Sequence, residues 1–259
     1  MNDALLAVSG LTKRFGGLTA VDAVDFAVER GRLHALIGPN GAGKTTMFNL
    51  VSGFISPNAG HVRFGGQDIT GWRPDRVAKV GLVRTFQIVR PFAEMTVLEN
   101  VLVGFHTRTR GGVGAALVRP PSTRRQDETI RAEAAQILNR IGLQDRAEEP
   151  ASNLTFGQQR FLEIGRALAV RPRLLMADEP AAGLNREETA FLGDLLGKLR
   201  DEGMAVLLVE HDVNLVMRIA EHIVVLDFGR KIAEGPPKVV QEDPAVHTAY
   251  LGDEEEESA

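Results

Sequence analysis

The chain has 259 residues, of which 44% are hydrophobic and 25% are charged, a composition ordinary for a soluble globular protein. It has no cysteine, which excludes disulfides and thiolate metal sites, and its longest apolar run, Met204–Val209, is far too short to span a membrane. The net charge of −4 comes from five acids at Asp253–Glu257: without them, 30 basic residues face 29 of the 34 acidic ones, a balance that argues against nucleic acid as the main partner.

The first half of the chain mixes strand and helix signals. The first ~30 residues and Gly60–Asp68 contain short strand-like pieces separated by glycine, which predicts an antiparallel edge. Between them, Leu33–Ile37 is a continuous apolar stretch that predicts a strand buried on both faces, and Thr45–Gly53 begins a helix. Residues 90–168 carry helical patterns without a convincing strand. Apolar residues at helical spacing mark two of these helices: Ile130, Ala134, Ile137, Leu138 and Ile141 in one, Phe161, Ile164 and Leu168 in the other.

The second half alternates regularly. The apolar stretches Leu174–Ala177, Ala205–Val209 and Ile223–Leu226 predict further buried strands, and Glu187–Arg200 predicts a helix between the first two. Strands that alternate with helices indicate an α/β fold with a parallel sheet. We therefore expect a domain over residues 4–252, with a core of about 4–88 and 169–252, a helical insertion of about 89–168, and a disordered acidic tail over 253–259.

A phosphate-binding loop follows the first buried strand. The sequence GPNGAGKTT fits the pattern G-x-x-x-x-G-K-[ST] and lies between a predicted strand and a predicted helix, as the motif demands. Its glycines let backbone N–H groups point inward at phosphate oxygens, and the helix N-terminus adds partial positive charge. Lys44 is expected to reach the β- and γ-phosphates, and Thr45 to offer its hydroxyl to Mg²⁺. The predicted phosphate ligands are Gly38, Pro39, Asn40, Gly41, Ala42, Gly43, Lys44, Thr45 and Thr46.

Polar residues at the ends of the later strands are candidates for catalysis. Asp178 ends a buried strand and is predicted to hold Mg²⁺, while Glu179 would orient and deprotonate an attacking water. His211 ends the next strand along the chain and would face the same crevice near the γ-phosphate. Gln87 lies at the junction with the helical insertion, where its amide could contact Mg²⁺ or the attacking water. Taken alone, an acid at a strand end, a single histidine and a surface glutamine are commonly structural.

Together these motifs resemble the ATP-binding cassette (ABC) family over about Leu5–Gly252, in the family's order. The resemblance implies a P-loop NTPase with a RecA-like parallel-sheet core, an N-terminal antiparallel β edge and an inserted helical subdomain. It also implies that Phe15 stacks on adenine, for which the alternative is a core phenylalanine. The loop Ala182–Asn185 would cross between two nucleotide sites, although Asn185 replaces a common Asp.

The loop LTFGQ, Leu154–Gln158, matches the family's signature loop. In the family, two cassettes pack head to tail, and each places this loop over the γ-phosphate that its partner holds. The residues agree with that role, because a hydroxyl (Thr155), a glycine (Gly157) and a helix start near Gln158 form a cap rich in hydrogen-bond donors. Thr155 and Phe156 stand where the commonest family loop has Ser and Gly; the hydroxyl is retained.

Longer stretches resemble one subgroup of the family. RFGGLTAVDAV, VRTFQIVRPFAEMTVLENVLVG, DEPAAGLN and the terminal AYLG are similar to an ATP-binding subunit of branched-chain amino acid importers. That resemblance implies ATP and Mg²⁺ as cofactors, and a second ABC ATPase subunit (a homologous partner or a second copy) in the head-to-tail dimer. It further implies two integral membrane permease subunits, an extracytoplasmic substrate-binding protein, and a peripheral location on the cytoplasmic face of the inner membrane.

Several alternatives stay open from the sequence. Importers of other amino acids, amides or urea share most of these features. The ATPase of lipopolysaccharide export is also similar, but it usually lacks an arm as long as the one around Arg108–Arg125. A non-transport ABC ATPase usually has two cassettes in one chain or a long coiled-coil insertion, and this sequence shows neither. A GTPase-type switch needs the guanine-reading motif N/T-K-x-D, and the nearest candidate, Thr12–Phe15, lacks the Asp. Phe86–Val103 is a candidate contact with the membrane subunits. The basic arm containing Arg108, Arg110, Arg119, Arg124 and Arg125 would touch lipid or a membrane subunit, or is a solvated loop.

Overall fold

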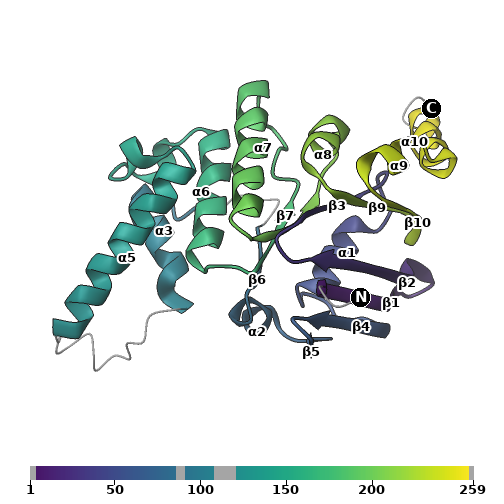
Figure 1. Ribbon diagram of the computed structural model, residues 1–259, viewed down its shortest axis with the longest axis horizontal. Helices are drawn as coiled ribbons and strands as arrows, with labels where there is room; N and C mark the ends of the chain where they lie inside the picture. The colour runs from purple at the N-terminus through teal and green to yellow at the C-terminus, as the bar shows by residue number, and fades with distance from the viewer. Residues whose placement is uncertain (1–3, 86–90, 108–120, 257–259) are drawn as a thin grey trace.

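The computed structural model describes residues 4–85, 91–107 and 121–256, and its centre is a six-stranded sheet of order β10-β9-β3-β8-β7-β6 (Figure 1). All neighbouring pairs are parallel except β9 and β10, which are antiparallel. The predicted α/β class and the four predicted buried strands are confirmed. The strands are β3 (Leu33–Ile37), β6 (Leu82–Arg84), β7 (Leu174–Asp178), β8 (Ala205–Val209), β9 (His222–Asp227) and β10 (Arg230–Gly235).

The central strands are buried on both faces, and alternate residues enter two different cores. In β8, Val206 and Leu208 belong to one cluster of buried side chains, whereas Ala205, Leu207 and Val209 belong to the other. This is the period of two expected for a pleated strand. It explains why these strands read as continuous apolar runs and not as alternating ones.

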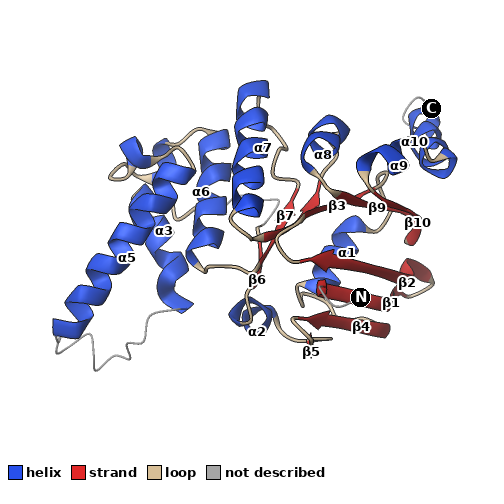
Figure 2. Ribbon diagram, in the orientation of Figure 1, coloured by secondary structure: helices blue, strands red, loops and turns tan. Residues whose placement is uncertain are grey.

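The N-terminal strands form a separate four-stranded antiparallel sheet of order β2-β1-β4-β5, and not an edge of the parallel sheet (Figure 2). Strands β2 and β4 alternate buried residues with more exposed ones over much of their length, as suits a sheet with one covered face, whereas β1 has adjacent buried pairs where its pairing register shifts. The covered face shares its core with the parallel sheet and with Met47 and Phe48 of helix α1. These elements are β1 (Ala4–Phe15), β2 (Leu18–Glu29), β4 (Ala59–Phe64), β5 (Gln67–Asp68) and α1 (Lys44–Val51).

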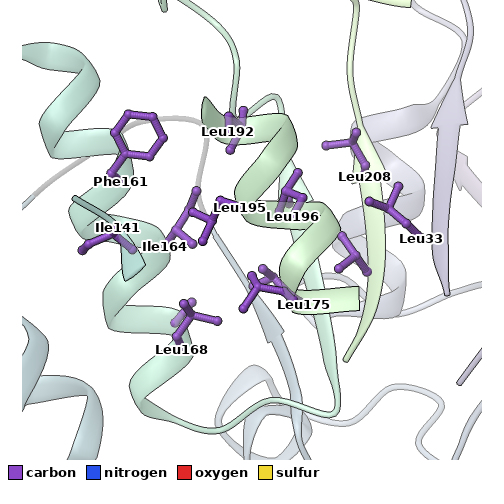
Figure 3. Close-up of a cluster of buried hydrophobic side chains, with 14 of the residues drawn as sticks. Leu33, Ile141, Phe161, Ile164, Leu168, Leu175, Leu192, Leu195, Leu196 and Leu208 are labelled. Atoms are coloured by element: carbon purple, nitrogen blue, oxygen red, sulfur yellow. The ribbon is translucent and has the colours of Figure 1, made fainter. Parts of the chain in front are cut away.

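In the segment expected to be a helical insertion, the described residues form helices joined by turns, with one isolated β-bridge between Thr96 and Pro150. The α6 side chains Phe161, Ile164 and Leu168 face Leu192 and Leu195 of α7, so the helical part and the sheet share one continuous core (Figure 3). The elements here are α3 (Val97–Gly104), the short 3₁₀ helices η1 (Phe105–Thr107), η2 (Gln144–Arg146) and η3 (Ala151–Asn153), α5 (Pro121–Arg140) and α6 (Phe156–Ala169). Residues 108–120, most of the basic arm, lie outside the described residues.

The remaining helices are α2 (Pro74–Lys79), α7 (Arg186–Asp201), α8 (Val213–Ile219), α9 (Pro237–Gln241) and α10 (Pro244–Glu256). We expected residues 253–259 to form a disordered tail, but α10 continues through Glu256, so residues 253–256 are helical in the structure. A reason is that Asp243 accepts the N–H of Ala245 at the helix start and that glutamate is a good helix former. Across the three described ranges, no helix combines the length and apolar character needed to cross a bilayer.

Candidate active site

The phosphate-binding loop connects β3 to α1 and is packed tightly against the backbone of strands β2 and β9. A Cβ atom on Gly38 would lie 2.0 Å from the carbonyl oxygen of Leu226, and one on Gly43 would lie 2.4 Å from that of Ala20. Both glycines also have positive φ, at 150° and 97°. Any side chain at these two positions would therefore displace neighbouring backbone, which explains the glycine requirement in physical terms.

The side-chain ammonium group of Lys44 is enclosed by the phosphate-binding loop. Its Nζ donates to the carbonyl oxygens of Gly38 at 2.6 Å and Pro39 at 2.8 Å, and the residue is only 5% exposed. The loop thus holds the ammonium group at the start of α1, where the helix dipole already adds positive charge. Positive charge gathered in this way favours a phosphate-bearing ligand.

A cavity of about 500 Å³ opens over this loop, which is a size typical of small-molecule sites. Most of the predicted ligands line it, together with Glu179 and His211; Gly38 and Pro39 lie beneath, bonded to Lys44. Phe15 lines the rim and is 49% exposed, so the alternative of a core phenylalanine is wrong. The predicted residues around the cavity are Phe15, Asn40, Gly41, Ala42, Gly43, Lys44, Thr45, Thr46, Glu179 and His211.

Glu179 and His211 meet across the cavity mouth. The Nε2 atom of His211 lies 2.8 Å from Oε1 of Glu179, which joins the loop after β7 to the loop after β8. Glu179 adopts a left-handed backbone, φ 47°, which is unusual for a residue other than glycine. Its N–H donates to the carbonyl of Val209 at 2.9 Å, which helps to hold this conformation. Backbone strain of this kind is concentrated at functional sites.

Asp178 ends β7 and is 2% exposed. Its Oδ2 accepts a 2.6 Å hydrogen bond from Nη2 of Arg84, and Arg84 also donates to Asn49 at 2.7 Å and to Ser52 at 3.2 Å. Sequence reasoning missed Arg84, although it lies three residues before Gln87 in the same motif. Gln87 itself lies outside the described residues.

The signature loop forms the N-terminus of α6. Thr155 Oγ1 accepts the N–H of Gln158 at 3.3 Å, and Gln158 Oε1 accepts the N–H of Thr155 at 3.0 Å, a complete capping box. The threonine hydroxyl still has its own proton to donate. Gly157 packs so closely on α7 that an added Cβ would lie 2.2 Å from Oε1 of Glu188. None of these residues lines the cavity over the chain's own phosphate loop.

The cavity also contains residues that the sequence did not reveal. Leu18, Thr19 and Ala20 come from the start of β2, and Phe228 and Gly229 from the turn between β9 and β10. A turn sequence such as DFG at Asp227–Gly229 carries no phosphate-binding signal of its own. Only the structure shows that this turn lies against the phosphate-binding loop, because the N–H of Gly229 donates a hydrogen bond to the carbonyl oxygen of Ala42 at 3.1 Å.

Comparison with known proteins agrees with this geometry. The family model described as ABC transporter matches residues 21–182, and the model described as branched-chain amino acid ATP-binding cassette transporter matches residues 230–256. The chain is 47% identical over 254 residues to the high-affinity branched-chain amino acid transport ATP-binding protein BraF of Pseudomonas aeruginosa, with 98% of this chain and all of BraF covered.

Solved structures of ABC cassettes have the same fold. The ADP conformation of MJ1267, an ATP-binding cassette of an ABC transporter, superposes with a TM-score of 0.84 at 33% identity, over 96% of this chain and 99% of that one. The cassette MJ0796, in a dimeric post-hydrolysis state bound to ADP and Pi, gives a TM-score of 0.75 at 26% identity, over 90% and 98% of the two chains. The chain therefore belongs to the ABC transporter family and is an ATP-binding cassette with ATPase function.

Proposed function

We propose that this cassette is the ATP-hydrolysing subunit of an importer of branched-chain amino acids. Support comes from BraF, a high-affinity branched-chain amino acid transport ATP-binding protein that is 47% identical over nearly the full length, and from the match of residues 230–256 to a model for that transporter class. The structural observation that carries the proposal is the placement of Glu179 and His211 on the same cavity as the phosphate loop.

The chemistry follows from that placement. The phosphate loop and Lys44 hold the triphosphate, and Phe15 stacks on the base at the rim. Glu179 accepts the proton of the attacking water, and His211 keeps this carboxylate at the mouth of the cavity through the 2.8 Å contact. The rate then depends on how well two loops hold one carboxylate in place.

The residues present fit Mg²⁺. Thr45 offers a hydroxyl oxygen beside the phosphate loop, and Asp178 offers a carboxylate at the end of β7, where its Oδ2 also accepts a hydrogen bond from Arg84. Mg²⁺ prefers oxygen ligands and commonly takes only one or two from the protein, with the rest from phosphate and water. When bound, the ion would neutralise charge on the β- and γ-phosphates. Gln87 is the third proposed ligand.

A second cassette completes the site in this proposal. Thr155, Gly157 and Gln158 do not line the chain's own cavity, so their donors serve the γ-phosphate of a partner cassette packed head to tail. The dimeric state of the related cassette MJ0796 supports this arrangement. ATP favours the closed dimer, and hydrolysis releases it.

The membrane partner is proposed to dock on the helical part. A cavity of about 530 Å³ there has a mixed lining: its apolar side chains are Met95, Leu102, Val103, Phe105 and Ile130, and its polar ones are Glu99, His106 and Arg131. A lining of this mixed character suits an amphipathic helix of a permease subunit. The cassette would then lie peripherally at the cytoplasmic face of the inner membrane, next to two permeases that receive substrate from an extracytoplasmic binding protein.

The test replaces Glu179 by glutamine, with Glu187→Gln as the matched control because Glu187 is an exposed acid in the first turn of α7. We expect Glu179→Gln to stop ATP turnover, keep ATP binding and collect as an ATP-bound dimer in gel filtration, while the control behaves as the natural protein. In cells that lack the chain, only the natural protein and the control should restore leucine, isoleucine and valine uptake. Undiminished turnover by Glu179→Gln, or restored uptake of urea alone, contradicts the proposal.

A further inference from the structure

Glu210 is a buried acid that neither binds nucleotide in the proposal above nor lines the cavity. It directly follows β8 and is 4% exposed. Its Oε1 accepts the N–H of Ala181 at 2.6 Å, its Oε2 accepts the N–H of His211 at 3.1 Å, and it takes a further bond from the N–H of Asp212. Burial is the largest influence on this carboxyl and raises its pKa, while the three N–H donors act in the opposite direction.

These donors belong to two different loops. Ala181 lies two residues after Glu179, in the loop that follows β7, whereas His211 and Asp212 lie in the loop that follows β8. The same two loops are joined a second time where His211 Nε2 meets Glu179 Oε1 at 2.8 Å. The two loops are therefore connected at two places, which we call joints: the contact between His211 and Glu179 at the cavity, and the hydrogen bonds to Glu210 in the interior.

The backbone between the two joints leaves little freedom. Glu179 is held in its left-handed conformation by the bond from its N–H to Val209, and its carbonyl accepts the N–H of Ala182 at 3.2 Å. If the bond between Glu210 and Ala181 were lost, the segment after Glu179 would lose its tie to the loop that carries His211. A shift of the order of 1 Å in a catalytic group can lower a rate by about 100-fold.

We propose that Glu210 is a positioning residue that fixes the Glu179 loop to the His211 loop, and that it passes movement of residues 181–185 on to His211. The second half of this inference rests on the proposed function, in which residues 182–185 cross toward the partner cassette. The carboxylate is suited to this task because one short side chain accepts N–H groups from both loops at once, and bonds to an ionised acceptor are stronger than neutral ones.

Glu210→Gln tests the proposal, because the amide keeps the shape but presents an NH₂ group to one of the N–H donors. Glu221→Gln is the matched control: Glu221 also accepts a backbone N–H, from Leu33 at 3.1 Å, but at the opposite end of the parallel strands. Glu210→Asp is the second variant, in case the amide impairs folding; it keeps the charge and withdraws the carboxylate by about 1.5 Å.

The first readout does not depend on nucleotide or on a partner. In the full-length chain, the imidazole ¹⁵N and ¹³C resonances of His211, assigned by their loss in a His211→Ala spectrum, should move in Glu210→Gln and Glu210→Asp and stay in place in Glu221→Gln. A purely structural role for Glu210 would lower the melting temperature without a selective change at His211. Unmoved His211 resonances in both Glu210 variants overturn the inference.

The second readout separates binding from turnover. Glu210→Gln should lower kcat for ATP by about 10- to 100-fold while the Kd for ATP stays within about twofold, since its partners lie outside the phosphate loop. An unchanged kcat, or a fall that only follows lost ATP binding, contradicts the inference. Glu179→Gln is measured alongside: if it still hydrolyses ATP, the proposed function fails, whereas an inactive Glu179→Gln beside a fully active Glu210→Gln refutes only the positioning role.

Discussion

The ion pair between Arg84 and Asp178 gives a sharp prediction, because almost all of it is buried. The two side chains are 9% and 3% exposed, and Nη2 lies 2.6 Å from Oδ2. Arg84→Met keeps most of the apolar stem but leaves the Asp178 carboxylate without its cation. Removing one partner from a buried pair costs about 3–5 kcal/mol, since the remaining charge stays desolvated. The lost bonds to Asn49 and Ser52 act in the same direction.

The free energy of unfolding measures this cost directly, by urea denaturation at pH 7 without nucleotide. Arg140→Met is the matched control: its Nη1 lies 2.7 Å from Glu202, nearly the same distance, but those side chains are 44% and 50% exposed. We expect at most about 1 kcal/mol there. Equal losses for Arg84→Met and Arg140→Met would refute the reasoning from burial.

A double-mutant cycle separates the pair from the rest of its surroundings. Asp178→Asn removes the charge from the acid, so Arg84→Met should cost less in the Asp178→Asn background than in the natural protein. The expected coupling is about 2–3 kcal/mol, at the upper end for residues in contact. Additive losses would show that Arg84 stabilises the fold through Asn49 and Ser52 and not through Asp178.

Two further predictions concern the signature loop and a buried histidine. Thr155→Ala should abolish hydrolysis at the partner's nucleotide in mixed dimers. Thr96→Ala is the control: it removes the same kind of capping box from α3 and should lower stability by a similar amount, about 1 kcal/mol, without this defect. A defect confined to the mutant chain's own nucleotide would contradict the cross-dimer cap. Burial lowers the pKa of His34 from 6.5 to about 4. Between these two pH values the imidazole is protonated in the unfolded chain but neutral in the folded chain, so stability that is present above pH 6.5 is lost as the pH falls toward 4. The loss at pH 5 is about 2 kcal/mol, and His34→Gln should remove this part of the urea-measured pH dependence; identical slopes contradict it.

The features whose positions could be predicted from the sequence are local ones. The phosphate-loop motif is one continuous segment between a strand and a helix, and Asp178 and Glu179 stand at the end of a strand that reads as apolar up to Ala177. By contrast, β6 has only three residues, too few to show a period, and β1 and β2 gave no indication that their sheet would be a separate one. A residue pattern shows which face of a strand is covered but not which sheet the strand joins.

The residues that the sequence missed depend on distant partners. Arg84 meets Asp178 across 94 positions, and Glu210 meets Ala181 across 29. Both contacts arise because β6, β7 and β8 lie side by side and bring their carboxyl ends to one edge. Nothing in VEHD or RTFQ distinguishes a buried acid or arginine from a solvated one, so only the strand order reveals these roles.

The same geometry indicates where motion must occur. The predicted base, histidine and metal ligand all come from loops or strand ends at the edge of β7 and β8, and the strands beneath are fully buried on both faces. Packed strands of this kind resist small displacements, because their side chains fill two cores at once. We therefore expect a response to nucleotide in the loops, whose relative position depends on a few polar contacts. Glu179, with its left-handed backbone and its contact with His211, takes part in those contacts, so the proposed catalytic carboxylate should be sensitive to a small loop movement.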